Sequence, residues 1–240
     1  AILRRAPRNA KNNSNSNLKF IRSSSAALPI VVMRQLEDIF NCPVIEAYGM
    51  TEASHQMASN PLPPLKRKPG SVGLASGPEI RIATEKGEHL PPNKIGEIMI
   101  RGANVTTGYR NNLEANEKNF LDGWFRTGDQ GMIDDEGYLT IKGRLKEIIN
   151  RGGEKISPLE VDELLLTHPN VNQAVTFSIP HDKLGEDIGA VLVLKNKNKT
   201  NKADVINFLK SRIIGFKIPK TIVFLSEIPT GSTGKIQRIG

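Results

Sequence analysis

Four residues within one short segment have side chains that suit a phosphorylated ligand. Tyr48 supplies an aromatic face, Gly49 permits close approach, Thr51 carries a hydroxyl and Glu52 carries a carboxylate. The ring can stack near a base, the hydroxyl can hydrogen-bond a phosphate oxygen, and the carboxylate can hold Mg²⁺ against phosphates. The set therefore suits a nucleotide. On the residues alone, a plain turn at Thr51 and Glu52 with a solvated acid is the simpler interpretation.

A glycine-rich segment near the end of the chain presents one lysine, Lys235, after Gly231 and Gly234. A P-loop would need a glycine five residues before Gly234 and a Ser or Thr after the lysine. Pro229 and Ile236 occupy those two positions. We therefore interpret the segment as a loop that offers a single ammonium group to an anionic ligand.

The stretch between these two motifs predicts a hinge between two packed units. A small-polar turn at 127–129 contains Asp129 and is followed by an alternating strand over 138–141. Residues 143–146 combine a glycine with two cations, a pattern typical of an exposed break between packed units. A hairpin with its turn at 152–153 comes next. Such a junction can bend, as in a lid that closes on a polyanion.

Five motifs resemble, in order and spacing, those of the adenylate-forming superfamily, which comprises the acyl-CoA synthetases with their luciferase and peptide-synthetase relatives. They are EAYGMTE, GEIMIRGANVTTGY, RTGD, GRLKEIINRGGEKISPLEVD and PTGSTGKIQR. The resemblance covers the chain from about Leu18 to its end. It implies an enzyme that uses ATP, Mg²⁺ and CoA to convert a small carboxylic acid into an acyl-adenylate and then an acyl-CoA. The family's phosphate-binding loop should lie upstream of Leu18, so we expect the C-terminal part of a longer protein, inactive by itself.

The resemblance also implies roles for individual residues. Thr51 contacts a phosphate and Glu52 holds Mg²⁺, while Asp129 accepts the ribose hydroxyls with Arg144 as its partner. Lys235 reaches the carboxylate and the α-phosphate, where its charge stabilises the in-line attack. Lys146 is the hinge of the lid, and Gly153 lines the CoA tunnel. The remaining nucleotide contacts fall on Tyr48, Gly49, Ser25, Ala26 and Ala27.

His55 and Ser23 are the residues that we expect at the acid substrate. His55 follows Glu52 by three positions and should therefore face the acyl pocket. A histidine suits a small acid whose second carboxylate needs a donor or a cation better than it suits a fatty or aromatic tail. The run from Glu46 to Gly73 is similar to that of the oxalate–CoA ligases, which implies oxalate as the acid.

Composition agrees with a globular protein and excludes few partners. The 240 residues are 38% hydrophobic and 24% charged, with a net charge of +8 that favours anionic ligands. No apolar run is long enough to span a membrane. The single cysteine, Cys42, fits a reducing compartment, so we expect a cytoplasmic protein. The residues 238–240 are not a peroxisomal tripeptide, although the parent protein can still be peroxisomal.

The apolar patterns predict an α+β fold in two domains, 1–142 and 143–240, with the hinge at 143–146. The first is the end of a large AMP-binding domain with a β-barrel-like subdomain, and the second is a small α+β lid. The basic loop 62–69 is interpreted as a solvated charge run, with contact to CoA or pyrophosphate as the alternative.

In the first domain we expect a helix over 29–40, capped by serines at 23–25, and strands over 18–21, 43–47, 79–84, 96–101, 131–134 and 138–141. In the lid we expect a hairpin over 147–157, helices over 158–167 and 203–213, and strands over 171–179, 188–195 and 218–224.

Two other functions stay open. The parent enzyme could activate a coumarate-like, fatty or amino acid, or pass its product to a carrier protein. A basic module that binds nucleic acid or a partner is the alternative from another class. Against it, the cations are dispersed, aromatic residues are only 5% of the chain, and no nucleic-acid motif is present. We therefore expect no nucleic-acid partner.

Overall fold

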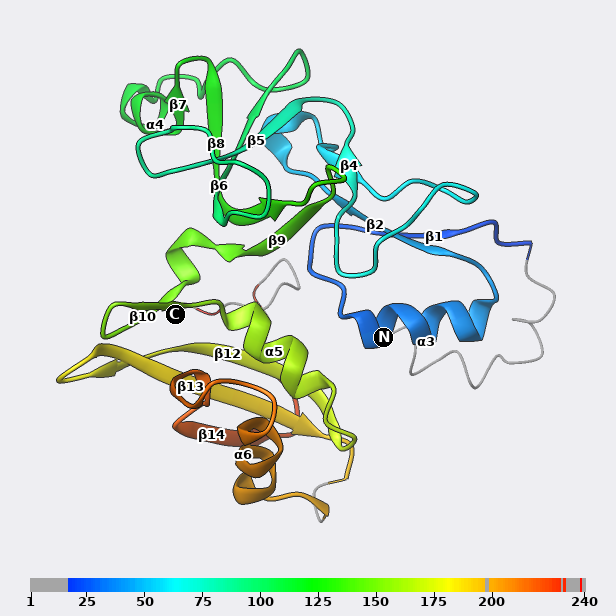
Figure 1. Ribbon diagram of the computed structural model, residues 1–240, viewed down its shortest axis with the longest axis vertical. Helices are drawn as coiled ribbons and strands as arrows, with labels where there is room; N and C mark the ends of the chain where they lie inside the picture. Colours follow the sequence, from blue (N-terminus) through cyan, green and yellow to red (C-terminus); the bar gives the residue numbers. More distant parts are fainter. Residues whose placement is uncertain (1–16, 197–198, 230, 232–237, 239–240) are drawn as a thin grey trace. The chain divides into compact units, whose positions relative to one another are not determined.

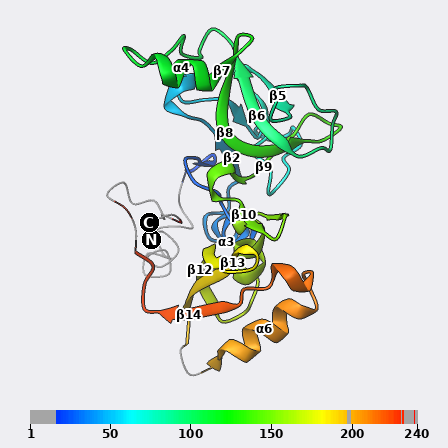
Figure 2. The same ribbon diagram turned by 90° about the vertical axis from the view of Figure 1, so that its left-hand side faces the viewer.

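The computed structural model describes residues 17–196, 199–229, 231 and 238. The chain separates into two compact units, 1–141 and 142–240 (Figures 1 and 2). Each unit has its own hydrophobic core. Within the described ranges, no helix has the length and apolar character needed to cross a membrane.

The first unit begins with a β–α–β element. Strand β1 (Ile21–Ser23) pairs in parallel with β2 (Val44–Tyr48), and α3 (Ile30–Phe40) connects them. Met33 and Leu36 of α3 pack with Val44 in one buried cluster. All five residues of β2 are buried, as expected for a central strand. Two short strands, β3 (Ala58–Ser59) and β4 (Leu74–Ala75), complete this four-stranded sheet.

Two predictions about this element were wrong. The first strand does not cover 18–21 but starts at Ile21, because its partner β2 begins opposite that residue, at Val44. The serines at 23–25 do not cap α3. Its N-cap is Pro29, which makes no side-chain capping bond. Residues 24–28 instead form the connection that carries the chain from the strand to the helix.

A five-stranded sheet forms the β-rich part of the first unit. It consists of β5 (Glu79–Ala83), β6 (Gly96–Arg101), β7 (Phe120–Leu121), β8 (Trp124–Ile133) and β9 (Leu139–Arg144). Ile98 and Ile100 of β6 and Phe125 of β8 are fully or almost fully buried in one cluster. A short helix, α4 (Leu113–Asn119), precedes β7 and was not predicted. It buries none of its residues, so no apolar periodicity marks it in the sequence.

The predicted turn at 127–129 was also wrong, because these residues lie inside the continuous strand β8. The pairing of β8 with β6 shifts register there: Glu97 faces Gln130, whereas Met99 faces Arg126. The glycine at the centre of the segment has a φ of +71°, which other residues rarely adopt. A bulge of this kind bends a strand and re-aims a side chain without ending the strand.

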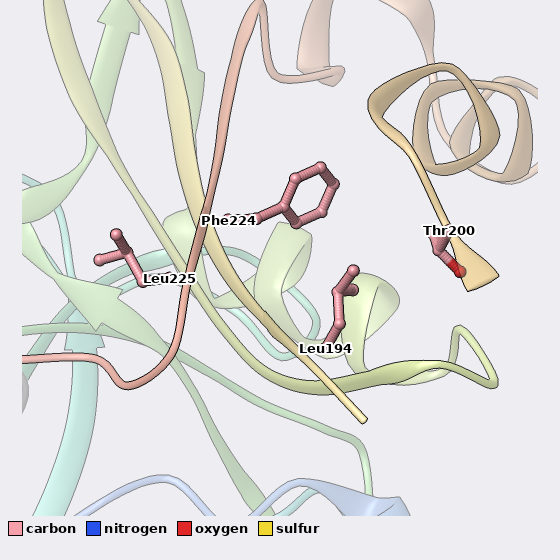
Figure 3. Close-up of a pocket in the computed structure, with 4 residues that line it drawn as sticks. All are labelled: Leu194, Thr200, Phe224 and Leu225. Carbon is pink, nitrogen blue, oxygen red and sulfur yellow. The ribbon is translucent and has the colours of Figure 1, made fainter. Parts of the chain in front are cut away.

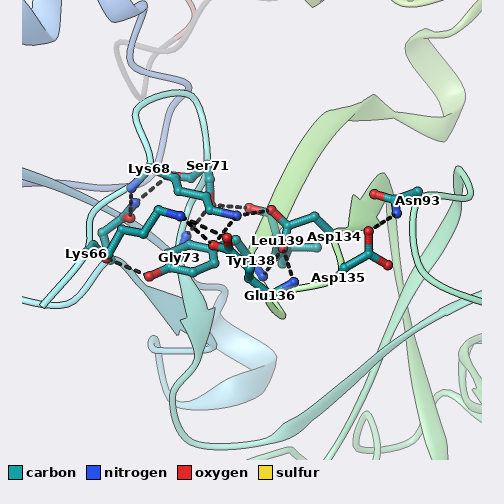
Figure 4. Close-up of polar contacts among 11 residues, drawn as sticks. Lys66, Lys68, Ser71, Gly73, Asn93, Asp134, Asp135, Glu136, Tyr138 and Leu139 are labelled. Atoms are coloured by element: carbon teal, nitrogen blue, oxygen red, sulfur yellow. Dashed lines mark hydrogen bonds and ion pairs between the residues drawn. The ribbon is translucent and has the colours of Figure 1, made fainter.

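The basic loop before β4 is attached to the turn before β9 by ion pairs. Lys66 pairs with Glu136 at 2.8 Å, and Lys68 pairs with Asp134 at 2.5 Å and with Glu136 at 2.7 Å (Figure 4). The Tyr138 hydroxyl donates to the Lys66 carbonyl at 2.6 Å. The loop lies at the surface, as expected for a solvated charge run: the Lys66 side chain is 64% exposed although it pairs with Glu136. Contact of the loop with CoA or pyrophosphate stays a prediction.

The second unit is an α+β domain around one sheet. Its strands are β10 (Ile149–Arg151), β11 (Glu154–Ile156), β12 (Val171–His181), β13 (Gly185–Leu194) and β14 (Thr221–Leu225). The predicted hairpin is confirmed: β10 and β11 pair in antiparallel fashion around the turn at 152–153. The helices α5 (Pro158–Leu166) and α6 (Lys202–Lys210) share one buried cluster with Ile188, Ala190 and Leu192 of β13. Ser157 caps α5 as expected for a residue before a proline at the first turn.

Several lid boundaries differ from the expected ones. β12 and β13 run on into one long hairpin, so that His181 pairs with Gly185. β14 starts only at Thr221, because residues 218–220, which follow a 3₁₀ turn at 215–217, are irregular. A small pocket lies beside β14 and is lined by Leu194, Thr200, Phe224 and Leu225 (Figure 3). None of the predicted site residues lines it.

Candidate active site

Tyr48 and Asp129 meet although they come from different sheets. Tyr48 ends β2, and its hydroxyl donates a hydrogen bond to Oδ2 of Asp129 in the β8 bulge. Both are buried, with 8% and 5% of their surface exposed. The Thr127 hydroxyl accepts from the Asp129 N–H at 3.1 Å and donates to the Ile98 carbonyl at 2.8 Å. Tyr48 thus holds the Asp129 carboxylate and Thr127 holds its backbone, which fits a fixed acceptor for a ligand hydroxyl.

The structure gives a reason for glycine at position 49 that the sequence did not reveal. A Cβ at this position would lie 1.4 Å from the carbonyl oxygen of His55. The chain folds back here through a 3₁₀ turn, η2 (Thr51–Ala53), and the His55 N–H donates to the Met50 carbonyl at 3.0 Å. The close approach that the glycine permits is thus to the chain's own backbone. Its contact with a nucleotide stays a prediction.

Glu52 lies in this 3₁₀ turn and is held at both ends. The Tyr109 hydroxyl donates to its Oε1 at 2.9 Å, and its carbonyl accepts from the Thr106 N–H at 2.7 Å. Burial, together with the neighbouring Glu52 carboxylate, raises the pKa of Tyr109 above its ordinary value. Tyr109 therefore stays protonated and keeps donating. Thr51, the adjacent candidate phosphate contact, is exposed.

These residues fit a bound Mg²⁺ that takes its other ligands from phosphates and water. Glu52 is half-buried and in the described part of the chain makes no ion pair, so its charge is not cancelled by a cation. The same part contains no group of three or more His, Cys, Asp or Glu side chains that could hold a metal by themselves. Mg²⁺ is commonly held by one or two carboxylates plus substrate phosphates.

The structure places His55 beside a cation that the sequence analysis missed. His55 has a φ of +82°, and its Nε2 lies 3.4 Å from Nη1 of Arg22 in β1. Arg22 also donates to Oε1 of Gln56 at 3.2 Å. Ser23, the other predicted substrate residue, is the next residue of β1. Imidazole and guanidinium nitrogens thus gather near the end of one strand.

The predicted adenine segment follows directly after this strand. Ser25 has a φ of +73°. Ser25, Ala26 and Ala27 are all exposed. Their contact with adenine stays a prediction.

The predicted lid residues lie in the second unit. Arg144 ends β9 and Lys146 lies in a 3₁₀ turn (Leu145–Glu147), and both are exposed. The Ser157 hydroxyl donates to the carbonyl of Lys142, and both residues belong to the second unit. Gly153 has a φ of +96°, and a Cβ there would meet nothing within 4 Å. Lys235 lies outside the described residues.

Comparisons with known proteins now place the chain in a family. The family of AMP-binding enzymes matches residues 1–110, and the AMP-binding enzyme C-terminal domain matches residues 160–235. The chain belongs to the AMP-binding enzyme family, the adenylate-forming enzymes, as the motifs predicted. Its solved relatives include the o-succinylbenzoate–CoA synthetase of Bacillus subtilis in complex with ATP and magnesium. That structure is 31% identical with a TM-score of 0.82, over 95% of this chain and 48% of the other.

Two curated relatives carry the same name. The chain is 51% identical to the oxalate–CoA ligase of Saccharomyces cerevisiae over 95% of its own length, and 51% identical to that of Arabidopsis thaliana over 92%. It spans 42% and 43% of these relatives, less than half of each. The α+β fold expected from the motifs is confirmed.

Sequence reasoning missed three residues of the candidate site: Tyr109, Arg22 and Asn116, whose side chain hydrogen-bonds to the Tyr109 backbone. Tyr109 stands in the motif GEIMIRGANVTTGY, which looked structural because of its turn glycines. Its 57-residue separation from Glu52 left no local pattern to connect the two. Arg22 was expected just after a strand and lies within one. Asn116 sits on the unpredicted helix α4.

Proposed function

We propose that this chain is part of an ATP-dependent, AMP-forming acid–CoA ligase. One observation carries the proposal: the buried Tyr48–Asp129 pair and the Tyr109-held Glu52 lie at the two ends of one short segment, 48–52. The tyrosine that holds the proposed ribose acceptor, Asp129, and the proposed cation ligand, Glu52, are thus carried by the same short segment. Family membership supports the same chemistry.

The proposed reaction has two steps. A carboxylate oxygen of the acid attacks the α-phosphorus of ATP, which forms an acyl-adenylate and releases pyrophosphate. The CoA thiolate then attacks the acyl carbon, and AMP leaves. Asp129 holds the ribose hydroxyls, Thr51 a phosphate oxygen, and Glu52 would hold Mg²⁺. When bound, the ion offsets the charge that develops as pyrophosphate departs.

A hinged lid would let one site serve both steps. In the first step Lys235 supplies the ammonium group that stabilises the attack. Rotation about Lys146 then withdraws Lys235 and brings Gly153 to the CoA channel. The exposure of Arg144 and Lys146 supports such a joint, since no core packing has to break at these side chains. Arg144 partners Asp129 at the ribose.

Oxalate is the proposed acid. A guanidinium and an imidazole 3.4 Å apart, from Arg22 and His55, suit a carboxylate better than an apolar tail. The oxalate–CoA ligases named above support the choice. An enzyme of this kind is expected in the cytoplasm, and the lone, buried Cys42 fits a reducing compartment.

The test is AMP release by the complete protein, with Mg²⁺, ATP and CoA, across oxalate, malonate, acetate, 4-coumarate and hexadecanoate. Oxalate should support the fastest release, and residues 1–240 alone should release none. His55→Leu should lower kcat/KM for oxalate at least about 10-fold, because a charged carboxylate loses a donor. Monocarboxylic acids should be affected far less. His89→Leu removes another exposed histidine and is the matched control.

Each negative outcome of this experiment contradicts a different part of the proposal. If no acid supports AMP release, the ligase proposal is wrong. If a monocarboxylic acid is preferred and His55→Leu leaves the acid profile unchanged, only the oxalate proposal is wrong. A salt-dependent nucleic-acid complex in the absence of ligase activity would favour the basic binding module instead.

A further inference from the structure

We propose that Tyr109 is a positioning residue that fixes the Glu52 carboxylate for a divalent ion, and that Asn116 in turn fixes Tyr109. The proposal rests on the function proposed above and assigns a role to two residues outside the predicted site. The Tyr109 hydroxyl donates to Oε1 of Glu52 at 2.9 Å. A ligating carboxylate is commonly oriented by such a neutral donor, which leaves its charge for the metal.

The chemistry of the donor distinguishes this arrangement from a structural ion pair. A carboxylate has about four lone-pair positions, and one phenol hydroxyl uses a single one of them. A lysine or arginine would have neutralised Glu52, as Arg126 does for Glu97 at 2.6 Å in the same unit. Within the described residues Glu52 has no such partner. Its negative charge therefore remains available to a cation.

Tyr109 is itself held by a two-point contact to its backbone. Asn116 Oδ1 accepts from the Tyr109 N–H at 2.7 Å, and Asn116 Nδ2 donates to the Tyr109 carbonyl at 3.0 Å. The Tyr109 ring packs at a tilt against Phe125, with the ring centroids 6.4 Å apart. Backbone and ring are thus both fixed before the hydroxyl reaches Glu52.

Helix α4 has no other evident task in the core. It contributes no buried residue, yet the Asn112 side chain caps it by accepting from the Ala115 N–H at 3.1 Å. A Cβ on Gly108 would lie 3.1 Å from Asn116 Oδ1, so the chain beside this asparagine is closely fitted to it. The helix is therefore built to present Asn116 to Tyr109, and through Tyr109 it reaches Glu52.

The experiment measures how much Mg²⁺ improves ATP binding to the complete protein. Calorimetry gives the Kd of ATP with excess Mg²⁺ and with the metal chelated, and the ratio of the two reports the metal contact alone. In Tyr109→Phe this ratio should fall roughly 10-fold, while the affinity for metal-free ATP stays the same. Asn116→Ala should shift the ratio in the same direction by a smaller factor.

Tyr138→Phe is the control, since it also removes a phenol hydroxyl, in this case from a buried tyrosine that donates to the Lys66 backbone carbonyl. Its ratio should equal that of the wild type. An unchanged ratio in Tyr109→Phe, or an equal loss of affinity with and without metal, overturns the proposal. Should Tyr109→Phe not fold, Asn116→Ala decides by the same criterion. Acid-dependent AMP release is scored separately, so its absence would contradict the ligase function without touching the metal contact.

Discussion

The hydroxyl of Tyr48 donates a hydrogen bond to Asp129, 81 residues further along the chain, and both side chains are buried. The bond connects β2 of the parallel pair with the bulge of β8. Two sheets of the first unit are thereby joined at the carboxylate that we assign to ribose binding. We therefore expect the contact to contribute both to stability and to ATP binding.

Tyr48→Phe should lower the stability of the protein and weaken its binding of ATP. The buried Asp129 carboxylate loses a donor, which costs about 1–3 kcal/mol of unfolding free energy. The KM for ATP should rise, because the acceptor for the ribose hydroxyls is no longer fixed. Urea unfolding and ATP-dependent kinetics of the complete protein measure the two effects. A loss of stability with an unchanged KM for ATP would leave Tyr48 a structural residue only.

Asp162 in α5 should make the stability of the lid depend on pH. Burial raises the pKa of Asp162 to about 6 from an ordinary 3.8, against the opposing effect of the Arg238 guanidinium 2.7 Å away. Between these pH values the folded state keeps a proton that the unfolded state has lost. Its stabilising contribution is therefore complete below about pH 3.8 and disappears as the pH rises through about 6.

Asp162→Asn should remove this dependence, which amounts to about 2–3 kcal/mol between pH 4 and pH 7. Asp187→Asn is the control with the opposite sign. Burial alone would raise the pKa of Asp187, but Arg151 at 2.8 Å and the Ile188 N–H hold it below its ordinary value. Its contribution is lost as the pH falls. Urea unfolding across this pH range decides, and equal pH profiles for both variants would refute the assignment.

Gly153→Ala tests the CoA channel separately from folding. Gly153 and Gly185 have φ values of +96° and +77°, and a Cβ at either position would meet nothing within 4 Å. Each alanine should therefore cost a similar 1–2 kcal/mol of backbone strain. Only Gly153→Ala should also raise the KM for CoA. Equal CoA kinetics in the two variants would remove Gly153 from the channel.

The sequence-based prediction was most accurate where apolar and polar residues alternate regularly or where a family motif is present. β6 covers 96–101 as predicted, and the turn at 152–153 forms the expected hairpin. The bulge at 127–129 was not predicted, because these residues have the composition of a turn and only the pairing of β8 with β6 on either side of them shows that the strand continues. Helix α4 was not predicted, because a helix without a buried face shows no apolar periodicity in its sequence.

Long-range partners were equally invisible. Nothing local indicates that Tyr109 donates to Glu52 or that Arg22 lies beside His55. Gly49 was predicted to permit close approach of a nucleotide, which stays a prediction; the structure shows that a Cβ there would collide with the carbonyl of His55. The sequence thus indicates which residue types suit a nucleotide site, and their roles stay predictions, whereas the groups that hydrogen-bond to these residues could not be predicted.

Lys235→Ala in the complete protein tests most directly whether the lid lysine serves one half-reaction only. Oxalate-dependent exchange of pyrophosphate into ATP measures adenylate formation, and CoA consumption from supplied oxalyl-adenylate measures thioester formation. We expect the exchange to fall by at least about 100-fold, since a preorganised charge at the transition state is lost. Thioester formation should stay within a few-fold of wild type. An equal loss in both half-reactions would contradict the division of labour between the two positions of the lid.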